Sequence, residues 1–386
     1  MKVYMFPGQG SQARGMGGDL FDEYAELTQQ ADEILGYSIK ELCLEDPRRE
    51  LNKTEFTQPA LYVVNALSYL KTLAQTGSKP DFVIGHSLGE FDALFAAECY
   101  DFAAGLKLVK KRGELMSQAS GGGMAAILNA SRAQIEEILE KNGLKSIDLA
   151  NYNTLSQIVI SGSREEIGKA EAFFQSGEML YYPLNTSGAF HSRFMLPAKE
   201  NFEAYIRKFT FSDPRIPVIS NVTAKPYQND AIAENLSSQI ASTVMWSDSI
   251  LYLLEQATLR GETADFEEVG HGDVLTKIVI KLQEEVASLP QQQEGQQGLG
   301  ATVESTSAEP NAVTGDAAAS LAVRVEQQVN AWNRQHGIGT KVKSTLVDDA
   351  ALETRTEAMV LFGHRAAVYM KGYNGYFDLD ELQPVQ

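Results

Sequence analysis

Short apolar runs and helical repeats of apolar residues alternate along the first part of the chain. Residues 3–6 and 82–84 are apolar runs with aromatic and β-branched members, which predict buried strands. Residues 88–97 and 102–116 place apolar side chains at helical spacing, so each segment predicts a helix with one buried face. Residues 57–61 predict the start of another helix, with a proline near its first turn. Because strands and helices succeed one another, the pattern predicts an α/β fold.

A second pattern interrupts the first between residues 123 and 186. Strands are predicted at 124–128, 147–152, 157–162 and 179–184, with helices at 131–141 and 165–176. The order β-α-β-β-α-β over about 60 residues is typical of a ferredoxin-like small domain. The large domain then comprises 1–122 and 187–288, and its second part contains predicted strands at 216–222 and 266–270 and helices at 232–240, 247–256 and 274–287.

The composition changes after residue 288. Residues 289–319 are rich in Gln, Gly, Ser, Thr and Ala with few large apolar side chains, which predicts a flexible linker. Residues 320–386 then predict a small α+β module that could form a barrel, with a helix at 321–334 and strands at 342–346, 356–362, 366–370 and 376–379.

The bulk composition limits the class of partner. The chain has 386 residues and a net charge of −18, which repels nucleic acid and anionic membrane surfaces. No apolar run approaches the roughly 18 residues of a membrane span, and the N-terminus lacks the longer apolar core of a signal peptide. The two cysteines and five histidines show neither disulfide nor metal-ligand spacing. These features predict a cytoplasmic protein without a bound metal.

Residues 85–89 read Gly-His-Ser-Leu-Gly between a predicted strand and a predicted helix. A G-x-S-x-G in this context places a serine on a sharp, strained turn, where the glycines keep Cβ atoms out of the crowded flanks. A G-x-S-x-G in a loop is often a chance pentapeptide, but the strand before and the helix after favour Ser87 as a nucleophile. The stretch therefore predicts acyl transfer or hydrolysis.

A serine nucleophile needs a base, and histidine is the usual one. A lone histidine is more often structural, yet His191 begins a helical run of apolar residues and is the favoured candidate. Its main rival is His271, which lies in a Gly-His-Gly turn. The others are poorer candidates, because one adjoins Ser87 in the bend and two lie beyond the linker: His86, His336 and His364.

A Gly-rich turn follows the first predicted strand. Residues 8–13 fit G-x-G-x-x-A, so a dinucleotide-binding turn has to be considered, but the acidic residue that this motif requires downstream is missing at a strand end. Asp32 instead lies inside a predicted helix. The alternative is that the turn directs backbone N–H groups and the Gln9 amide at a substrate carbonyl.

Arg112 lies among the apolar residues of its predicted helix, whereas Lys107 and Lys110 lie on the far face. A guanidinium on a buried face needs an anion, because an unpaired buried charge is costly. Spacing alone leaves two alternatives equally open. One is an internal ion pair with Asp or Glu, and the other is a carboxylate-bearing substrate held bidentately.

Six motifs occur in an order that resembles one enzyme family. They are FPGQGSQ at 6–12, TQPA at 57–60, GHSLGE at 85–90, KRG at 111–113, AFHS at 189–192 and EVG at 268–270. The set resembles the malonyl-CoA:acyl-carrier-protein transacylases and the acyltransferase domains of polyketide synthases. The resemblance extends from residue 1 to about residue 287.

The resemblance implies an α/β-hydrolase-like large domain with a parallel sheet and an inserted ferredoxin-like small domain. It also implies ping-pong transfer of a malonyl group from malonyl-CoA to the phosphopantetheine thiol of an acyl carrier protein or a polyketide synthase carrier domain. No cofactor is implied. The tail beyond residue 288 resembles free-standing acyltransferases that serve polyketide synthases in trans, although fatty acid synthesis is the family's other role.

Residue by residue, the resemblance implies Ser87 as the nucleophile and His191 as its general base. Arg112 matches the arginine that binds the malonyl carboxylate, which favours the substrate alternative. The other matched positions are the oxyanion-hole amides of Gln9 and Leu88, the histidine-orienting carbonyl of Gln239, and the pocket residues Gln58, Asn153 and Phe190. A flat ring at Phe190 implies a preference for malonyl over the branched methylmalonyl group.

Two other functions compete with this interpretation. One is an acyl-carrier-protein hydrolase of the same fold, but such relatives typically lack the arginine that Arg112 supplies. The other is a non-catalytic carrier-docking protein, against which the intact Ser87 and His191 argue.

The sequence also departs from the family pattern, because Asp92 stands where a small residue is usual. Docking of an acidic carrier is expected at a local basic surface that includes Lys107, Lys110, Arg207 and Lys208.

Overall fold

The computed structural model describes residues 1–175, 177–186, 188–228, 230–289, 327–344, 352–354, 357–361, 365–370, 376–379 and 382–384. The chain divides into two units, Met1–Pro290 and Gln291–Gln386. Each unit has sheets and a hydrophobic core of its own. The predicted linker 289–319 lies outside the described residues except for Leu289.

The first unit is built on a four-stranded parallel sheet in the order β7-β2-β1-β8. Its strands are β1 (Lys2–Phe6), β2 (Phe82–Gly85), β7 (Val218–Ile219) and β8 (Asp265–Glu268). Alternate side chains of β1 enter different cores, with Tyr4 on one face and Val3 on the other. Burial on both faces explains why the strands read as continuous apolar runs.

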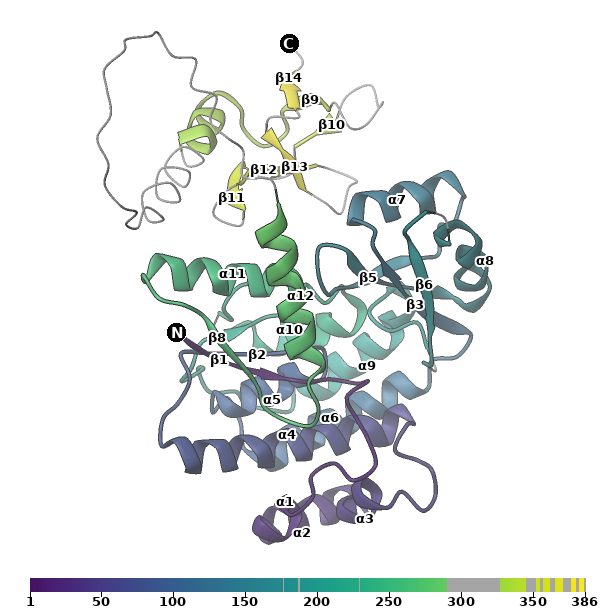
Figure 1. Ribbon diagram of the computed structural model, residues 1–386, viewed down its shortest axis with the longest axis vertical. Coiled ribbons are helices and arrows are strands. Elements are labelled where there is room, and N and C mark those ends of the chain that lie inside the picture. Colours follow the sequence, from purple (N-terminus) through teal and green to yellow (C-terminus); the bar gives the residue numbers. More distant parts are fainter. Residues whose placement is uncertain are drawn as a thin grey trace, which may run out of the picture. The chain divides into compact units, whose positions relative to one another are not determined.

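Helices cover both faces of this sheet (Figure 1). One face packs against α4 (Thr54–Thr76), α5 (Gly89–Ala96) and α6 (Phe102–Ser117), and the other against α11 (Trp246–Leu259) and α12 (Val274–Ser288). The remaining helical segments of the described large domain are α1 (Leu20–Glu23), α2 (Ala25–Leu35), α3 (Ile39–Leu44), η1 (Arg193–Met195), α9 (Leu196–Ile206), α10 (Ile232–Ser238) and η2 (Gln239–Ala241).

Two predicted element boundaries are wrong. The strand expected at 216–222 is limited to β7, because the Ser220 N–H donates to Lys225 O and the Asn221 N–H donates to a side chain, so neither can join the sheet. Helix α4 begins at Thr54 rather than at residue 57, which places Pro59 inside the helix. Proline there has no N–H to donate, so the helix forgoes one interior hydrogen bond.

A second, antiparallel sheet lies within the first unit in the order β4-β5-β3-β6. Its strands are β3 (Gly122–Leu128), β4 (Asp148–Tyr152), β5 (Gln157–Ser163) and β6 (Leu180–Leu184). One face packs against α7 (Arg132–Lys141) and α8 (Arg164–Phe174), while Met124 and Val159 on the other face join the core of the parallel sheet. The smaller sheet is thereby anchored to the larger core.

The second unit contains two three-stranded antiparallel sheets, β10-β9-β14 and β11-β12-β13. Their strands are β9 (Lys341–Ser344), β10 (Leu352–Glu353), β11 (Met359–Leu361), β12 (Arg365–Tyr369), β13 (Tyr376–Asp378) and β14 (Leu382–Pro384). A helix precedes them, of which 327–335 is described. Strands β10 and β14 were not predicted, because two or three residues are too few to show alternation.

Candidate active site

Ser87 lies on a tight turn between β2, which ends at Gly85, and α5, which begins at Gly89. Its φ is +53°, a left-handed conformation that a non-glycine residue rarely adopts. A Cβ on Gly85 would lie 1.9 Å from the Gly89 carbonyl carbon, and one on Gly89 would lie 2.0 Å from Phe6 O. The two glycines of the predicted motif are therefore required by close backbone approach.

Asn221 holds this turn from a distant part of the chain. Its Oδ1 accepts from the Ser87 N–H at 2.7 Å, and its Nδ2 donates to Gly85 O at 2.7 Å. The side chain thus replaces backbone hydrogen bonds that the turn cannot make for itself. Sequence reasoning missed Asn221, and the only signal was a polar residue near the end of a predicted strand.

His191 faces Ser87, as predicted, with Nε2 at 2.8 Å from Ser87 Oγ. Its Nδ1 lies 2.7 Å from Gln239 O and 3.2 Å from Ser242 O. Two carbonyl acceptors require the proton on Nδ1, so Nε2 has a free lone pair for the serine proton. Among the described histidines His191, and not His271, lies within hydrogen-bonding distance of Ser87.

The electrostatic surroundings keep His191 neutral. Burial, together with the positive charge of Arg112, lowers the pKa of His191 to about 3, although the two carbonyls oppose this change. The imidazole is therefore unprotonated at neutral pH and ready to accept a proton. The same carbonyls would stabilise the imidazolium that forms during proton transfer.

Arg112 is almost fully buried on α6 and points at the same hydroxyl. Its Nη2 donates to Ser87 Oγ at 3.0 Å and to Gln239 Oε1 at 2.6 Å, while its Nε has no hydrogen-bond partner in the described part of the chain. No described carboxylate forms a salt bridge with it. Burial lowers the pKa of Arg112 to about 9, and the charge of Glu90 opposes this. Of the two sequence alternatives, the internal ion pair is not formed.

Gln239 connects the three groups just described. Its backbone carbonyl accepts from His191, and its side-chain Oε1 accepts from Arg112. Its Nε2 donates to Ser87 O and to Glu90 Oε2, both at 2.8 Å. Sequence reasoning assigned only the carbonyl contact and missed the side-chain contacts as well as Glu90. An acidic residue inside an apolar helix was the available signal for Glu90.

The two amides predicted as oxyanion donors come from the residue after Ser87 and from a loop that packs on the serine turn. Leu88 directly follows Ser87, and the loop that carries Gln9 packs on the bend so closely that a Cβ on Gly8 would lie 2.3 Å from His86 O. Neither the Gln9 nor the Leu88 backbone N–H has a hydrogen-bond partner in the part of the chain that the structure describes.

The remaining predicted pocket residues are buried near the site without touching Ser87. Gln58 Nε2 lies 3.5 Å from Met116 Sδ, and its Oε1 has no partner among the described residues. Asn153 Oδ1 lies 3.0 Å from the Nε2 of His86, whose pKa burial lowers. Phe190 is buried directly before His191.

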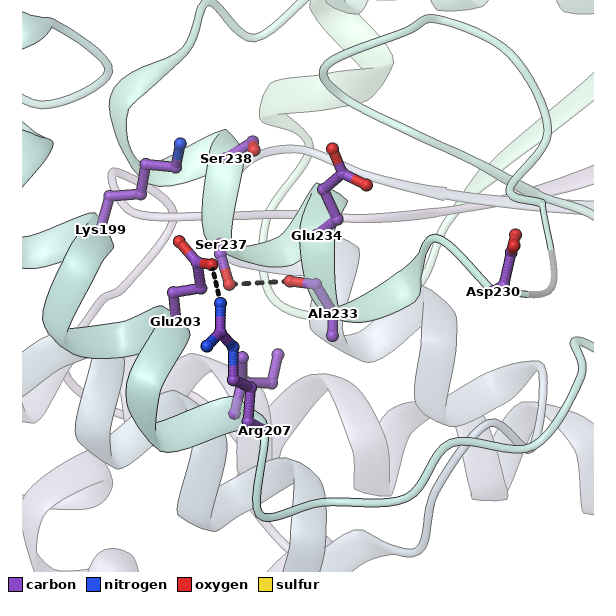
Figure 2. Close-up of a pocket in the computed structure, with 9 residues that line it drawn as sticks. Lys199, Glu203, Arg207, Asp230, Ala233, Glu234, Ser237 and Ser238 are labelled. Atoms are coloured by element: carbon purple, nitrogen blue, oxygen red, sulfur yellow. Dashed lines mark hydrogen bonds and ion pairs between the residues drawn. The ribbon is translucent and has the colours of Figure 1, made fainter.

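A pocket of about 370 Å³ lies apart from these groups, between α9 and α10 (Figure 2). It is lined by charged side chains, among them Glu203 and Arg207, which pair with each other. Neither Ser87 nor His191 lines it. Within the described residues, no group of three or more His, Cys, Asp or Glu could hold a metal ion, and no helix is long and apolar enough to cross a membrane.

The parallel sheet, the serine on its strand–helix turn and the facing histidine are typical of enzymes of acyl transfer or hydrolysis. The family described as "Acyl transferase domain" matches residues 3–298, and the chain belongs to this family. Residues 299–386 lie outside the match.

Relatives with known names narrow the comparison. The chain is 55% identical over 292 residues to the polyketide biosynthesis malonyl CoA-acyl carrier protein transacylase PksC of Bacillus subtilis, which covers 75% of this chain and 100% of PksC. It resembles the crystal structure of a malonyl CoA-acyl carrier protein transacylase from Burkholderia pseudomallei with a TM-score of 0.73 and 58% identity, covering 74% of this chain and 98% of the other.

A third similar structure is a complex with a carrier protein. A solved malonyl-transacylase in complex with its type II polyketide synthase acyl-carrier protein matches with a TM-score of 0.68 and 30% identity, over 73% of this chain and 93% of the other.

Proposed function

We propose that this chain transfers a malonyl group from malonyl-CoA to the phosphopantetheine thiol of an acyl carrier protein in polyketide biosynthesis. Relatives with these names, and a related complex with a carrier protein, support the substrate and the partner. The observation that carries the proposal is Arg112, a buried cation that forms no salt bridge with any carboxylate of the described residues and lies 3.0 Å from the hydroxyl of Ser87. A malonyl carboxylate would supply the missing anion.

In the first half-reaction, Ser87 Oγ attacks the thioester carbonyl while its proton passes to His191 Nε2. The Gln9 and Leu88 N–H groups would stabilise the oxyanion of the tetrahedral intermediate, a contribution worth roughly 3–4 kcal/mol per donor in such sites. Collapse breaks the C–S bond, and the proton on His191 passes to the coenzyme A thiolate. The product is a malonyl ester of Ser87.

In the second half-reaction, the phosphopantetheine thiol gives its proton to His191 and attacks the ester. Collapse then breaks the C–O bond and returns the proton from His191 to Ser87 Oγ. Arg112 would hold the malonyl carboxylate in both steps, Gln239 would orient the histidine, and Gln58, Asn153 and Phe190 would line the acyl pocket. The chemistry needs no cofactor.

The same proposal assigns the parts of the chain. Residues 1–122 and 187–288 would form the α/β-hydrolase-like acyltransferase domain, and 123–186 a ferredoxin-like domain, which the strand order β4-β5-β3-β6 supports. Residues 289–319 would be a linker to a C-terminal module at 320–386. We also infer a cytoplasmic site of action, where malonyl-CoA and carrier proteins are used.

Incubation with radiolabelled malonyl-CoA tests this function. We expect label on the wild-type protein that moves to a holo carrier protein, and no label on Ser87→Ala. Release of the label as free malonate without transfer would instead indicate a hydrolase of the same fold. Absence of any label on a folded wild-type protein would indicate a non-catalytic carrier-docking protein.

A further inference from the structure

Glu90 is a carboxylate with no exposed surface, in the first turn of α5, three residues after Ser87. Its Oε1 accepts from the Asn221 N–H and from the Tyr227 O–H, both at 2.8 Å. Its Oε2 accepts from Gln239 Nε2 at 2.8 Å. Among the described residues, Glu90 forms no hydrogen bond with Ser87 Oγ, His191 or Arg112. Two of its partners do contact the site, because Asn221 accepts from the Ser87 N–H and Gln239 bonds to Arg112 and His191.

The side-chain amide of Gln239 can adopt two orientations, which differ by exchange of the positions of Oε1 and Nε2. In the observed orientation Oε1 accepts from Arg112, and Nε2 donates to Ser87 O and Glu90 Oε2. The reverse orientation would place an N–H₂ group against the guanidinium and an oxygen against a carboxylate. An ionised Glu90 therefore selects the orientation that holds Arg112.

We propose that Glu90 is a positioning residue for acyl-group selection, which fixes the Gln239 amide so that its Oε1 holds the Arg112 guanidinium beside Ser87. This inference rests on the proposed function, because the ligand of Arg112 is taken to be the malonyl carboxylate. The second set of contacts, through Asn221 to the Ser87 turn, supports every acyl group alike. Only the path through Gln239 and Arg112 distinguishes malonyl from acyl groups without a carboxylate.

Glu90 also has a protonation state that can change. The charged and titratable groups that act on it are Arg112 on α6, Tyr227 after β7 and Tyr100 after α5. Burial raises the pKa of Glu90 to about 7, against the opposing effect of its three hydrogen bonds and of Arg112. Protonation would give the Glu90 carboxyl group an O–H that donates to another partner. The hydrogen bond from Gln239 Nε2 that fixes the amide orientation would therefore be lost at acidic pH.

Asp92 provides a matched control on the same helix. It is equally buried, but it accepts from Asn65 Nδ2 at 2.9 Å and contacts no residue of the site. Asp92→Asn keeps an acceptor for that bond. Both substitutions, Glu90→Gln and Asp92→Asn, replace a buried carboxyl group on α5 with an amide of the same shape, so they differ in which network they disturb.

The experiment measures acylation of Ser87 by malonyl-CoA and by acetyl-CoA in the same preparations. In Glu90→Gln, the N–H₂ group of the new glutamine would face the N–H₂ group of Gln239. Two donors cannot form a hydrogen bond with each other, so the Gln239 amide would rotate into its reverse orientation. We expect kcat/KM for malonyl-CoA to fall by about 10- to 100-fold, with less than about a threefold change for acetyl-CoA. Asp92→Asn should keep the wild-type ratio of kcat/KM for malonyl-CoA to kcat/KM for acetyl-CoA.

The inference would be overturned if Glu90→Gln left the ratio of kcat/KM for malonyl-CoA to kcat/KM for acetyl-CoA unchanged, including by lowering both values equally. It would also be overturned if Asp92→Asn lowered this ratio as much as Glu90→Gln does. If wild type itself is not acylated by malonyl-CoA, the proposed function fails first, and this outcome is visible without any variant. Failure of the proposed function and failure of the inference about Glu90 can therefore be told apart.

A pH series gives a second test that does not require Glu90→Gln to fold. In wild type, the malonyl/acetyl ratio should decline as pH falls through about 7, following Glu90. Tyr227→Phe removes a hydrogen bond that lowers the pKa of Glu90, so the decline should move to higher pH. A wild-type ratio that stays constant between pH 5 and 8, or a decline that Tyr227→Phe leaves in place, would overturn the inference.

Discussion

Ser87 and His191 both adopt a left-handed backbone conformation, with φ values of +53° and +57°, but the chain holds the two turns in different ways. The serine turn is closed by backbone against backbone, which Gly85 and Gly89 permit. The histidine turn is closed by a side chain, because Ser192 Oγ donates to Ala189 O at 2.6 Å. Close backbone approach at two glycines is thus specific to the Ser87 turn itself, where Asn221 adds hydrogen bonds from outside the turn.

The two turns also depend on different parts of the molecule. Gly122, at the start of β3 in the smaller sheet, lies so close to Ala189 that a Cβ there would be 2.3 Å from the Ala189 nitrogen. The Ser87 turn therefore lies between a strand of the parallel sheet and helix α5, while the His191 turn lies where the two sheets meet. This difference predicts that damage to the first turn is the more severe.

The largest effect is expected for Gly85→Ala. Its Cβ would overlap the Gly89 backbone, which cannot move without shifting α5, so we expect a loss of about 3 kcal/mol or more in the free energy of unfolding. Acylation by malonyl-CoA should be abolished. Urea unfolding and the labelling assay check both effects.

Gly143→Ala is the matched control for this prediction. Gly143 has a positive φ, of +67°, which Gly85 does not, but a Cβ on Gly143 would meet no atom within 4 Å, so only the backbone strain of about 1 kcal/mol should appear. Equal unfolding midpoints for the two variants would show that close approach at Gly85 is unimportant.

This contrast explains how much of the site could be predicted from the sequence. The strand, bend and helix around Ser87 lie within one short stretch, so residue spacing was enough to predict them. Nothing near His191 indicates its partner, because Gln239 and Gly122 reach it from distant elements. The family resemblance predicted that pairing, whereas the contacts of Glu90 and Asn221 depend on how helix α5 packs against the chain after β7.

A smaller effect is expected for Asn221→Ala, which removes the side chain that holds the serine turn. Two buried backbone groups lose their partner, the Ser87 N–H and Gly85 O. The expected loss is about 10- to 100-fold in the rate of acylation, since each unpaired buried group costs about 1–3 kcal/mol and part of that cost falls on stability. Malonyl-CoA and acetyl-CoA should be affected alike.

The control for this prediction is Asn201→Ala on α9. The Asn201 side chain also donates to a backbone carbonyl, that of Pro197, at 2.8 Å, but it is exposed. Its removal should leave acylation unchanged. An Asn221→Ala protein as active as Asn201→Ala would mean that the two glycines hold the serine turn without help.

The smallest effect concerns the titratable side chain of the histidine turn, His191 itself. Burial, aided by Arg112, lowers the pKa of His191 to about 3, whereas an unfolded histidine titrates near 6.5. Between these values the unfolded chain binds more protons, so His191 lowers the stability of the fold as pH falls below about 6.5. From pH 7.5 to 6, wild type should lose about 1 kcal/mol relative to His191→Gln. Other groups, Glu90 included, are common to both proteins and cancel in the difference. Urea unfolding of the two proteins at the two pH values measures this difference. A difference between wild type and His191→Gln that does not change with pH would show that His191 titrates normally and is not enclosed as the geometry requires.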